Sequence, residues 1–261
     1  MSDPTRRVGN LVCDLDGVVY RGETVIPGAG EALRKLDQAG YNIIFATNNS
    51  SKTNDQVAEK IGRLSGYAVK PDQVVTSAEA AAALLGAGRR RVYIVGGEGL
   101  RTAMVDAGHE LVEEGRTATA VVVGFDRDLT YDRLREATFA LLGGARFIAS
   151  NLDNTFPAAG NDLWPGAGSM VAALEASSGR TAEPAGKPFE PMRRLIAAKL
   201  LAGPVYAVGD RPETDLELGR RAGWSTVLTL SGITTPTEAV GIVADLVVST
   251  LAELPAALNV S

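Results

Sequence analysis

Short apolar runs alternate with longer amphipathic segments along most of the 261-residue chain. Residues 8–13 and 41–46 are almost continuously apolar, which is typical of strands that are buried on both faces of a parallel sheet. Between them, Ala32, Leu33 and Leu36 recur at helical spacing within residues 29–38, and Gly40 follows as a stop signal. The pattern therefore predicts a strand, a helix and a second strand in succession.

The same alternation continues to the end of the chain. Further strands are expected at residues 73–76, 91–95, 120–123, 147–149, 205–208, 226–230 and 246–248. Helices are expected at residues 53–64, 99–107, 131–142, 170–176, 191–201 and 214–222, with a short helix at the C-terminus. This order predicts an α/β fold with a doubly wound, mainly parallel sheet of the Rossmann-like kind. The middle block has apolar strands and helices of its own, so we expect it to form a second core.

Composition narrows the range of functions. Apolar residues make up 45% of the chain and charged residues 22%, and the formal net charge is −5. A negative chain whose longest basic run is Arg89–Arg91 argues against nucleic-acid or membrane-surface binding, because those functions depend on basic patches. No apolar run approaches the ~18 residues that a membrane span requires. With a single cysteine and no intrachain disulfide, the protein is expected to be cytoplasmic.

The scarcity of histidine and cysteine excludes several catalytic classes. His109 is the only histidine, so zinc sites with several histidines and phosphatases that need two histidines are excluded. Cys13 lies in an apolar strand, and Val19 stands where a cysteine-dependent phosphatase needs arginine, so Cys13 is expected to pack in the core. Pro188 follows Lys187, so no Walker A loop is present. Any phosphate chemistry must therefore use carboxylates.

Carboxylates follow two of the expected strands. Asp14 and Asp16 come directly after the first strand, on one face because strands repeat every two residues, and Gly17 allows a tight exit. Asp210 ends a later strand, and Asp215 begins the next helix. Taken alone, an Asp-x-Asp-Gly segment is a common turn, and Asp215 is favourable near any helix N-terminus. In a doubly wound sheet, however, these strand ends meet at one edge, where ligands bind.

Groups suited to phosphate accompany the carboxylates. The segment Thr47–Ser51 offers hydroxyls, amides and backbone N–H groups before a helix, although an ordinary N-cap cluster has the same composition. Lys187 lies in a loop between Gly186 and Pro188. Carboxylates about 4 Å apart repel by roughly 4 kcal/mol at an effective dielectric near 20, and a hard cation such as Mg²⁺ removes that cost. An aspartate can then act as a nucleophile on phosphorus.

Together these motifs resemble the haloacid-dehalogenase-like hydrolases. The four motifs are DLDGV at 14–18, the strand end at Thr47, Lys187, and GDRPETD at 209–215. The segments DLDGVVYRGETVIPGA, TNNSS and GKP are similar to the class IIA branch, which includes 4-nitrophenylphosphatase-like, phosphoglycolate and glycerol-phosphate phosphatases. This branch inserts an α/β cap domain between the second and third motifs. The resemblance covers essentially the whole chain and implies a discontinuous core domain, residues 1–79 and 183–261, with a cap at 80–182.

The resemblance also implies roles for the acidic residues. Asp14 attacks phosphorus and is phosphorylated, while Asp16 protonates the leaving alcohol and then deprotonates water. The ligands of Mg²⁺ are the Asp14 carboxylate, the backbone carbonyl of Asp16 and Asp210, and Asp215 supports the metal.

The remaining implied residues bind substrate. Thr47, Asn48 and Lys187 hold the phosphoryl group. Asn151 and Asp153 of the cap are expected to face the leaving group and influence specificity, although a plain connecting loop is an equally good interpretation. The implied substrates are small phosphorylated metabolites such as glycerol phosphate or phosphoglycolate, and the cap implies a homodimer.

Three alternatives remain. Gly96-Gly97-Glu98-Gly99 follows a strand, as a dinucleotide-binding loop does, but Thr102 stands in place of the third glycine. A non-catalytic metabolite-binding protein has no chemical need for the full acidic set. A phosphotransferase or mutase on the same fold is closer, because the capped site can exclude water or admit it.

Overall fold

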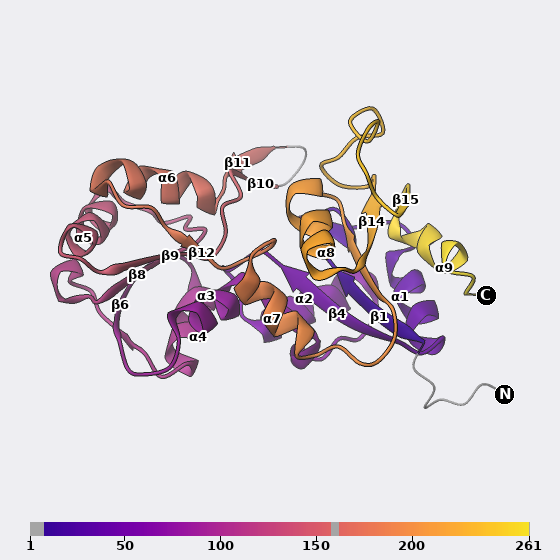
Figure 1. The fold of residues 1–261 in the computed structure, drawn as a ribbon, viewed down its shortest axis with the longest axis horizontal. Helices are drawn as coiled ribbons and strands as arrows, with labels where there is room; N and C mark the ends of the chain where they lie inside the picture. Colours follow the sequence, from indigo (N-terminus) through magenta and orange to yellow (C-terminus); the bar gives the residue numbers. More distant parts are fainter. Residues whose placement is uncertain (1–7, 158–161, 261) are drawn as a thin grey trace.

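Two parallel sheets lie side by side along the long axis of the molecule (Figure 1). The computed structural model describes residues 8–157 and 162–260. One sheet has six strands and the other five, and helices lie between and around them. The α/β fold class expected from the sequence is confirmed. None of the helices in the described residues is long and apolar enough to cross a membrane.

The six-stranded sheet has a reversal of strand order at its centre. Its order is β15 (Leu246–Val248), β14 (Ser225–Thr229), β13 (Val205–Gly209), β1 (Gly9–Cys13), β4 (Tyr41–Thr47) and β5 (Val74–Thr76). Every neighbouring pair is parallel. The chain adds β4 and β5 on one side of β1 and then β13 to β15 on the other. This reversal creates a crevice at the carboxyl ends of β1 and β13.

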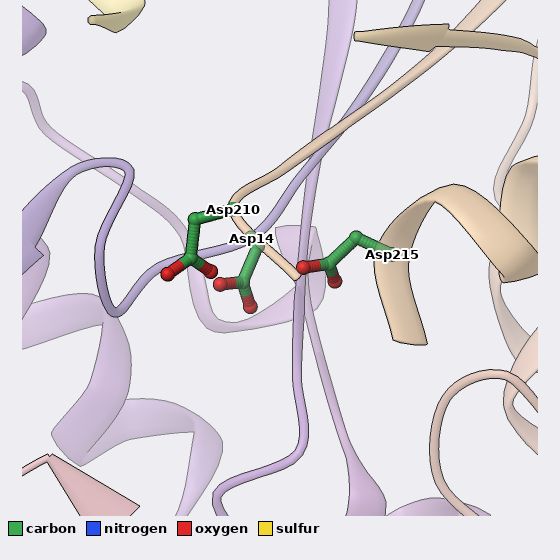
Figure 2. Close-up of side chains that lie close together, drawn as sticks. All are labelled: Asp14, Asp210 and Asp215. Carbon is green, nitrogen blue, oxygen red and sulfur yellow. The ribbon is translucent and has the colours of Figure 1, made fainter. Parts of the chain in front are cut away.

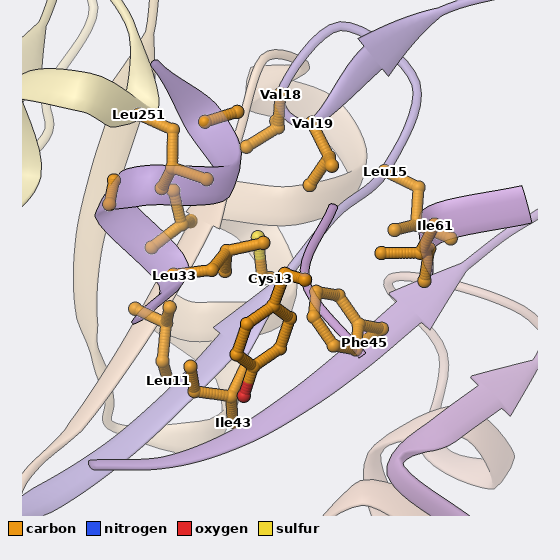
Figure 3. Packing of buried hydrophobic residues seen from close by; sticks show 14 of the residues in the cluster. Leu11, Cys13, Leu15, Val18, Val19, Leu33, Ile43, Phe45, Ile61 and Leu251 are labelled. Carbon is orange, nitrogen blue, oxygen red and sulfur yellow. The ribbon is translucent and has the colours of Figure 1, made fainter. Parts of the chain in front are cut away.

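Alternation along β1 supplies both faces of this sheet. Leu11 and Cys13 point into one core and Val12 into the other. The first core, drawn in Figure 3, is covered by α1 (Ala29–Gln38), α2 (Asn54–Ser65) and α9 (Leu254–Ala257). Cys13 is buried there, as expected from the sequence. The second core is covered by α3 (Ser77–Leu85), α7 (Glu190–Ala197) and α8 (Glu217–Ala222).

The five-stranded sheet comes from the middle of the chain. Its order is β12 (Glu183–Pro184), β9 (Arg146–Ala149), β8 (Ala120–Val123), β6 (Arg91–Val95) and β7 (Glu110–Leu111), all parallel. Helices α5 (Tyr131–Leu142) and α6 (Ala167–Ser178) enclose a separate core on one face. On the other face, α4 (Glu98–Asp106) and α3 belong to the cluster that also contains Val12 and Ile44 of the first sheet. The second core expected for the middle block exists, and one face of this block is shared with the other sheet.

Two antiparallel hairpins and several short helical turns complete the described fold. The hairpins are β2 (Tyr20–Arg21) with β3 (Thr24–Val25), and β10 (Thr155–Pro157) with β11 (Leu163–Pro165). The turns are Pro71–Gln73, Gly115–Thr117, Pro212–Leu216 and Leu251–Glu253. The helix expected at 214–222 divides into the Pro212–Leu216 turn and α8, and the helix expected at 191–201 ends at Ala197.

Glycines at the carboxyl ends of the five-stranded sheet pack against the other sheet's loop. The Gly99 N–H donates to the Ser51 carbonyl at 3.0 Å. A β-carbon at Gly99 would overlap the backbone of Lys52, and one at Gly124 would overlap the Ser50 hydroxyl. The glycines around α4 therefore have a packing reason that requires no bound dinucleotide.

Candidate active site

The carboxyl ends of the central strands line one small cavity of about 60 Å³. All but one of the site residues expected from the sequence line it: Asp14, Asp16, Thr47, Asn48, Asn151, Asp153, Lys187 and Asp215. The remaining one, Asp210, is buried directly beside it. Residues from the beginning, middle and end of the chain are thus brought together.

Three carboxylates form the acidic centre (Figure 2). Oxygen atoms of Asp14, Asp210 and Asp215 all lie within 4.8 Å of one another. Asp14 follows β1, Asp210 follows β13, and Asp215 comes from the helical turn after β13. Gly17 has φ near 87°, and a β-carbon there would crowd the Asp210 carboxylate, so glycine is required at this exit from β1. The Asp16 carboxylate is not part of this group of three.

Lys187 is the cation inside the acidic centre. Its Nζ lies 2.6 Å from Asp14 Oδ1 and 2.7 Å from Asp215 Oδ1, and the side chain is 3% exposed. It also donates to the Ala46 carbonyl at 2.8 Å, which fixes its direction. Burial acts to lower the pKa of Lys187, but attraction to the two carboxylates outweighs burial and raises that pKa above its usual value. Lys187 is therefore fully charged at neutral pH.

One lysine does not balance three carboxylates. Burial, reinforced by Asp215 and Asp210, raises the pKa of Asp14 well above its ordinary value against the opposing effect of Lys187. Burial and the charge of Asp215 raise the pKa of Asp210 to about 7. Within the described ranges, Asp210 Oδ1 is buried and has no hydrogen-bond partner. An all-oxygen donor set with excess negative charge and an unpaired buried oxygen fits a hard divalent cation.

Asp16 occupies a different environment in the same cavity. Burial raises its pKa, while Lys60 and the Gly22 N–H oppose that effect. A raised pKa favours the protonated form of this carboxyl group, which suits a residue that gives a proton and later takes one back. Asp14 and Asp16 are thus two residues apart in the chain but differ in their surroundings.

Asn48 connects the cavity walls. Its Oδ1 accepts from the Lys187 N–H at 2.8 Å, and its Nδ2 donates to Asp153 Oδ1 at 3.1 Å. Its backbone carbonyl accepts from Asn151 Nδ2 at 2.7 Å. Both ends of the Asn48 amide are therefore engaged by protein groups, and its role as a phosphate ligand stays a prediction. The neighbouring Thr47 is buried, and its hydroxyl accepts from the Asn49 N–H at 3.1 Å.

The loop after β9 brings Asn151 and Asp153 into the cavity. Burial raises the pKa of Asp153, opposed chiefly by Arg211 and Lys187. Sequence reasoning assigned no role to Arg211 or Phe125, which line the cavity together with Phe156 of the segment that follows Asn151. Arg211 lies inside the GDRPETD motif, so its position next to Asp210 was an available signal.

Family comparisons agree with this geometry. A family model described as haloacid dehalogenase-like hydrolase matches residues 11–110, and one described as HAD-hydrolase-like matches residues 184–254. The chain is also 36% identical to chronophin from Mus musculus over 92% of this chain and 86% of that protein. The chain belongs to the haloacid dehalogenase-like hydrolases. The resemblance inferred from the four sequence motifs is thereby confirmed.

Two further relatives are named as phosphatases, and one of them has a solved structure. Phosphoglycolate phosphatase 2 from Arabidopsis thaliana is 34% identical over 87% of this chain and 84% of its own length. The crystal structure of a glycerol phosphate phosphatase from Mycobacterium tuberculosis in complex with magnesium superposes with a TM-score of 0.86 at 33% identity. That match covers 97% of this chain and 78% of the other.

Proposed function

We propose that this protein is a Mg²⁺-dependent phosphatase that hydrolyses small phosphorylated metabolites through a phosphorylated Asp14. The observation that carries the proposal is the acidic centre, in which Asp14 shares a small cavity with Lys187 and lies within 4.8 Å of two further carboxylates. The family supports a phosphoric monoester hydrolase, and relatives named as phosphatases of phosphoglycolate and of glycerol phosphate support small phosphorylated substrates.

The proposed reaction has two steps. In the first, an oxygen of Asp14 forms a bond to phosphorus as the ester P–O bond breaks, and Asp16 gives its proton to the leaving oxygen. In the second, Asp16 takes a proton from water, the water oxygen bonds to phosphorus, and the bond to Asp14 breaks to release phosphate. Lys187 holds Asp14 in position throughout and, with Thr47 and Asn48, is assigned to the phosphoryl group.

The metal would be held by Asp14 and Asp210, with the Asp16 backbone carbonyl as a further ligand and Asp215 in support. When bound, Mg²⁺ supplies positive charge that lets an anionic ester approach an anionic nucleophile. The excess negative charge of the acidic centre and the unpaired Asp210 Oδ1 support this assignment.

The proposal includes a division into a core domain, residues 1–79 and 183–261, and a cap domain, residues 80–182. All strands of the six-stranded sheet come from the core segments, which supports this division. Residues 1–7 and 261 of the core and 158–161 of the cap lie outside the described ranges. The boundary at 182 falls directly before β12, so this division counts β12 with the core although β12 pairs with β9 of the five-stranded sheet.

We also propose a cytoplasmic location and a homodimer. The homodimer is testable by light scattering.

The test is hydrolysis of 4-nitrophenyl phosphate with Mg²⁺ by the wild type and Asp14→Asn. Asp14→Asn should fold normally, judged by circular dichroism, and lose essentially all turnover, whereas the exposed Asp72→Asn should retain it. EDTA should silence the wild type, and added Mg²⁺ should restore it. Near-normal rates in Asp14→Asn would refute the nucleophile, and full activity in EDTA would refute the metal. A phosphate-release screen of metabolites, ranked by kcat/KM, then identifies the substrate.

A further inference from the structure

A much larger groove of about 790 Å³ adjoins the catalytic cavity. The two share Asn49, Phe125 and Phe156, so a ligand can extend from one into the other. The groove is bounded by the β2–β3 hairpin and α2 on one side, and by the β8–α5 segment and β11 on the other. The catalytic cavity has room for little more than a phosphoryl group, whereas the groove is in the size range of pockets that hold whole metabolites.

One part of the groove is aromatic. The rings of Phe125 and Phe156 are stacked with centroids 4.6 Å apart and an interplanar angle of 19°. Trp164 is 38% exposed and carries the Arg127 guanidinium 4.7 Å from its ring centroid. Because Phe125 and Phe156 also line the catalytic cavity, the portion of a ligand nearest the ester meets flat apolar surface.

The rest of the groove is cationic, although the whole chain has a net charge of −5. Its charged lining residues are Arg21, Lys52, Lys60, Arg127 and the single acid Glu23. Glu23 is already paired, with Arg63 at 2.6 Å and Lys60 at 3.7 Å.

Two of these cations remain available to a ligand. Among the described residues, neither Lys52 nor Arg127 has an acidic partner within ion-pairing distance. Arg127 is exposed and is oriented by its contact with Trp164, which leaves its N–H groups able to meet a carboxylate or phosphate edge-on.

We propose that this groove binds the leaving group and selects phosphomonoesters whose leaving group is flat or apolar beside the ester and anionic at its far end. The inference rests on the proposed phosphatase function. Asp153 lines the cavity beside the ester, where a second anion would be repelled, so the negative group belongs at the distal end near Lys52 and Arg127. A leaving group as small as glycerol would fill little of the groove.

A matched pair of substrates tests the charge. 4-Carboxyphenyl phosphate and 4-carbamoylphenyl phosphate have nearly the same shape and differ in the charge of the distal group. Arg127→Gln should lower kcat/KM for the carboxylate about tenfold, mainly through KM, and change the carboxamide by less than about twofold. Arg89→Gln, which removes an exposed cation of the cap outside the groove, should change neither. Comparing variants on each substrate cancels differences in intrinsic leaving-group reactivity.

A second substitution tests the flat surface. Trp164→Leu should lower kcat/KM for both aryl esters, more for the carboxylate because Arg127 also loses its contact with the ring, and leave glycerol phosphate unchanged. Equal effects of Arg127→Gln on carboxylate and carboxamide, or an equal effect of Trp164→Leu on glycerol phosphate, would overturn the inference while leaving phosphatase activity intact.

Binding separates this inference from the proposed function. With Mg²⁺ present, Asp14→Asn should bind 4-carboxyphenyl phosphate more tightly than 4-carbamoylphenyl phosphate in calorimetric titration, and adding Arg127→Gln should remove the difference. If the wild type hydrolyses neither ester but this difference in binding persists, the proposed phosphatase reaction fails and the groove assignment stands. Equal binding of the two esters contradicts the groove assignment whatever the rates are.

Discussion

The two sheets of this protein are built from the same alternation of strand and helix, yet their carboxyl ends serve different purposes. In the six-stranded sheet, β1 and β13 end in Asp14 and Asp210, which gather around Lys187. In the five-stranded sheet, β6 and β8 are followed by glycines, and the backbone there packs against the segment after β4 of the six-stranded sheet. We call each sheet with its helices a lobe, and the lobe of the five-stranded sheet is the cap lobe. Alternation thus determines the architecture of both lobes, while the few residues after each strand decide between chemistry and docking.

These two kinds of strand end meet at one segment. Ser50, Ser51 and Lys52 follow β4 and contact Gly124, Gly97 and Gly99 of the cap lobe. The same segment continues directly from Thr47 and Asn48, which line the catalytic cavity. Docking of the five-stranded sheet is therefore coupled to the catalytic cavity through the segment Thr47–Lys52, and changes on either side of this contact can separate the two contributions.

The largest effect is expected in the acidic centre of the six-stranded sheet, from Lys187→Met. Removing the lysine leaves buried carboxylates without their cation, which costs roughly 3–5 kcal/mol when a buried pair is broken. We expect kcat/KM for 4-nitrophenyl phosphate to fall roughly 10²–10³-fold, because a positioned donor at the reacting group is lost. Thermal unfolding without Mg²⁺ should begin at a lower temperature than in the wild type.

Lys35→Met is the control for Lys187→Met. Lys35 lies in an exposed pair with Glu31 in α1, and such pairs contribute little to stability. Its activity and melting temperature should match the wild type. Normal stability and turnover in Lys187→Met would mean that the lysine is not the cation on which the acidic centre depends.

An intermediate effect is expected where the five-stranded sheet packs against the segment after β4, from Gly99→Ala. The new β-carbon would overlap the Lys52 backbone, and overpacking of this kind costs about 1–3 kcal/mol, more than the gain of about 1 kcal/mol in helix propensity. The cap and the segment after β4 should shift apart slightly, lowering kcat roughly tenfold because positioning is lost. Measurements are kcat for 4-nitrophenyl phosphate and the free energy of unfolding in urea.

Gly62→Ala is the matched change in α2. Its β-carbon would meet nothing closer than the Tyr67 carbonyl oxygen at 3.8 Å, an ordinary contact. This variant should be as stable as the wild type or more stable by up to about 1 kcal/mol, with unchanged kcat. If both alanine variants behave alike, the glycines of the cap lobe are not there for docking.

Much of this comparison was accessible from the sequence, and the exceptions have physical causes. Buried parallel strands such as β1 and β6 are nearly continuous apolar runs, so their positions were predicted closely. Helix α3 was missed because it is almost entirely alanine and leucine and is buried between the sheets, so it shows no polar face. Its capping box, formed by Thr76 and Glu79, is the signal that would have found it.

The site also contains contacts that the sequence predicted and contacts that it did not. Asp14, Asp210 and Lys187 follow strand ends in motif order, so their meeting was predictable from topology. The link from Asn48 to Asp153 joins residues 105 positions apart in different lobes, and nothing in either local sequence indicates it. The aromatic and basic lining of the adjoining groove is equally dispersed along the chain, so only the folded structure reveals it.

The smallest effect is expected at the hydrogen bond from Asn48 to Asp153, which joins the two lobes inside the cavity. Asp153→Asn keeps an oxygen that can accept from Asn48 Nδ2, so folding and cap docking should be preserved. It removes a negative charge beside the ester, so we expect kcat/KM to change by about three- to tenfold in favour of esters with an anionic group close to phosphorus, such as phosphoglycolate, relative to glycerol phosphate. Asn151→Ser, which loses the bond to the Asn48 carbonyl, should lower kcat for all esters by a similar, smaller factor.

The exposed Asp128→Asn, also in the cap segment, is the control and should leave the substrate profile unchanged. A profile that is the same in Asp153→Asn and wild type would assign this loop to structure alone. Specificity would then reside entirely in the groove beyond Phe125 and Phe156. A shifted profile would instead mean that the cap contributes a charged group to the cavity itself, so the docking lobe takes part in substrate choice at the same strand ends where the core lobe carries out the chemistry.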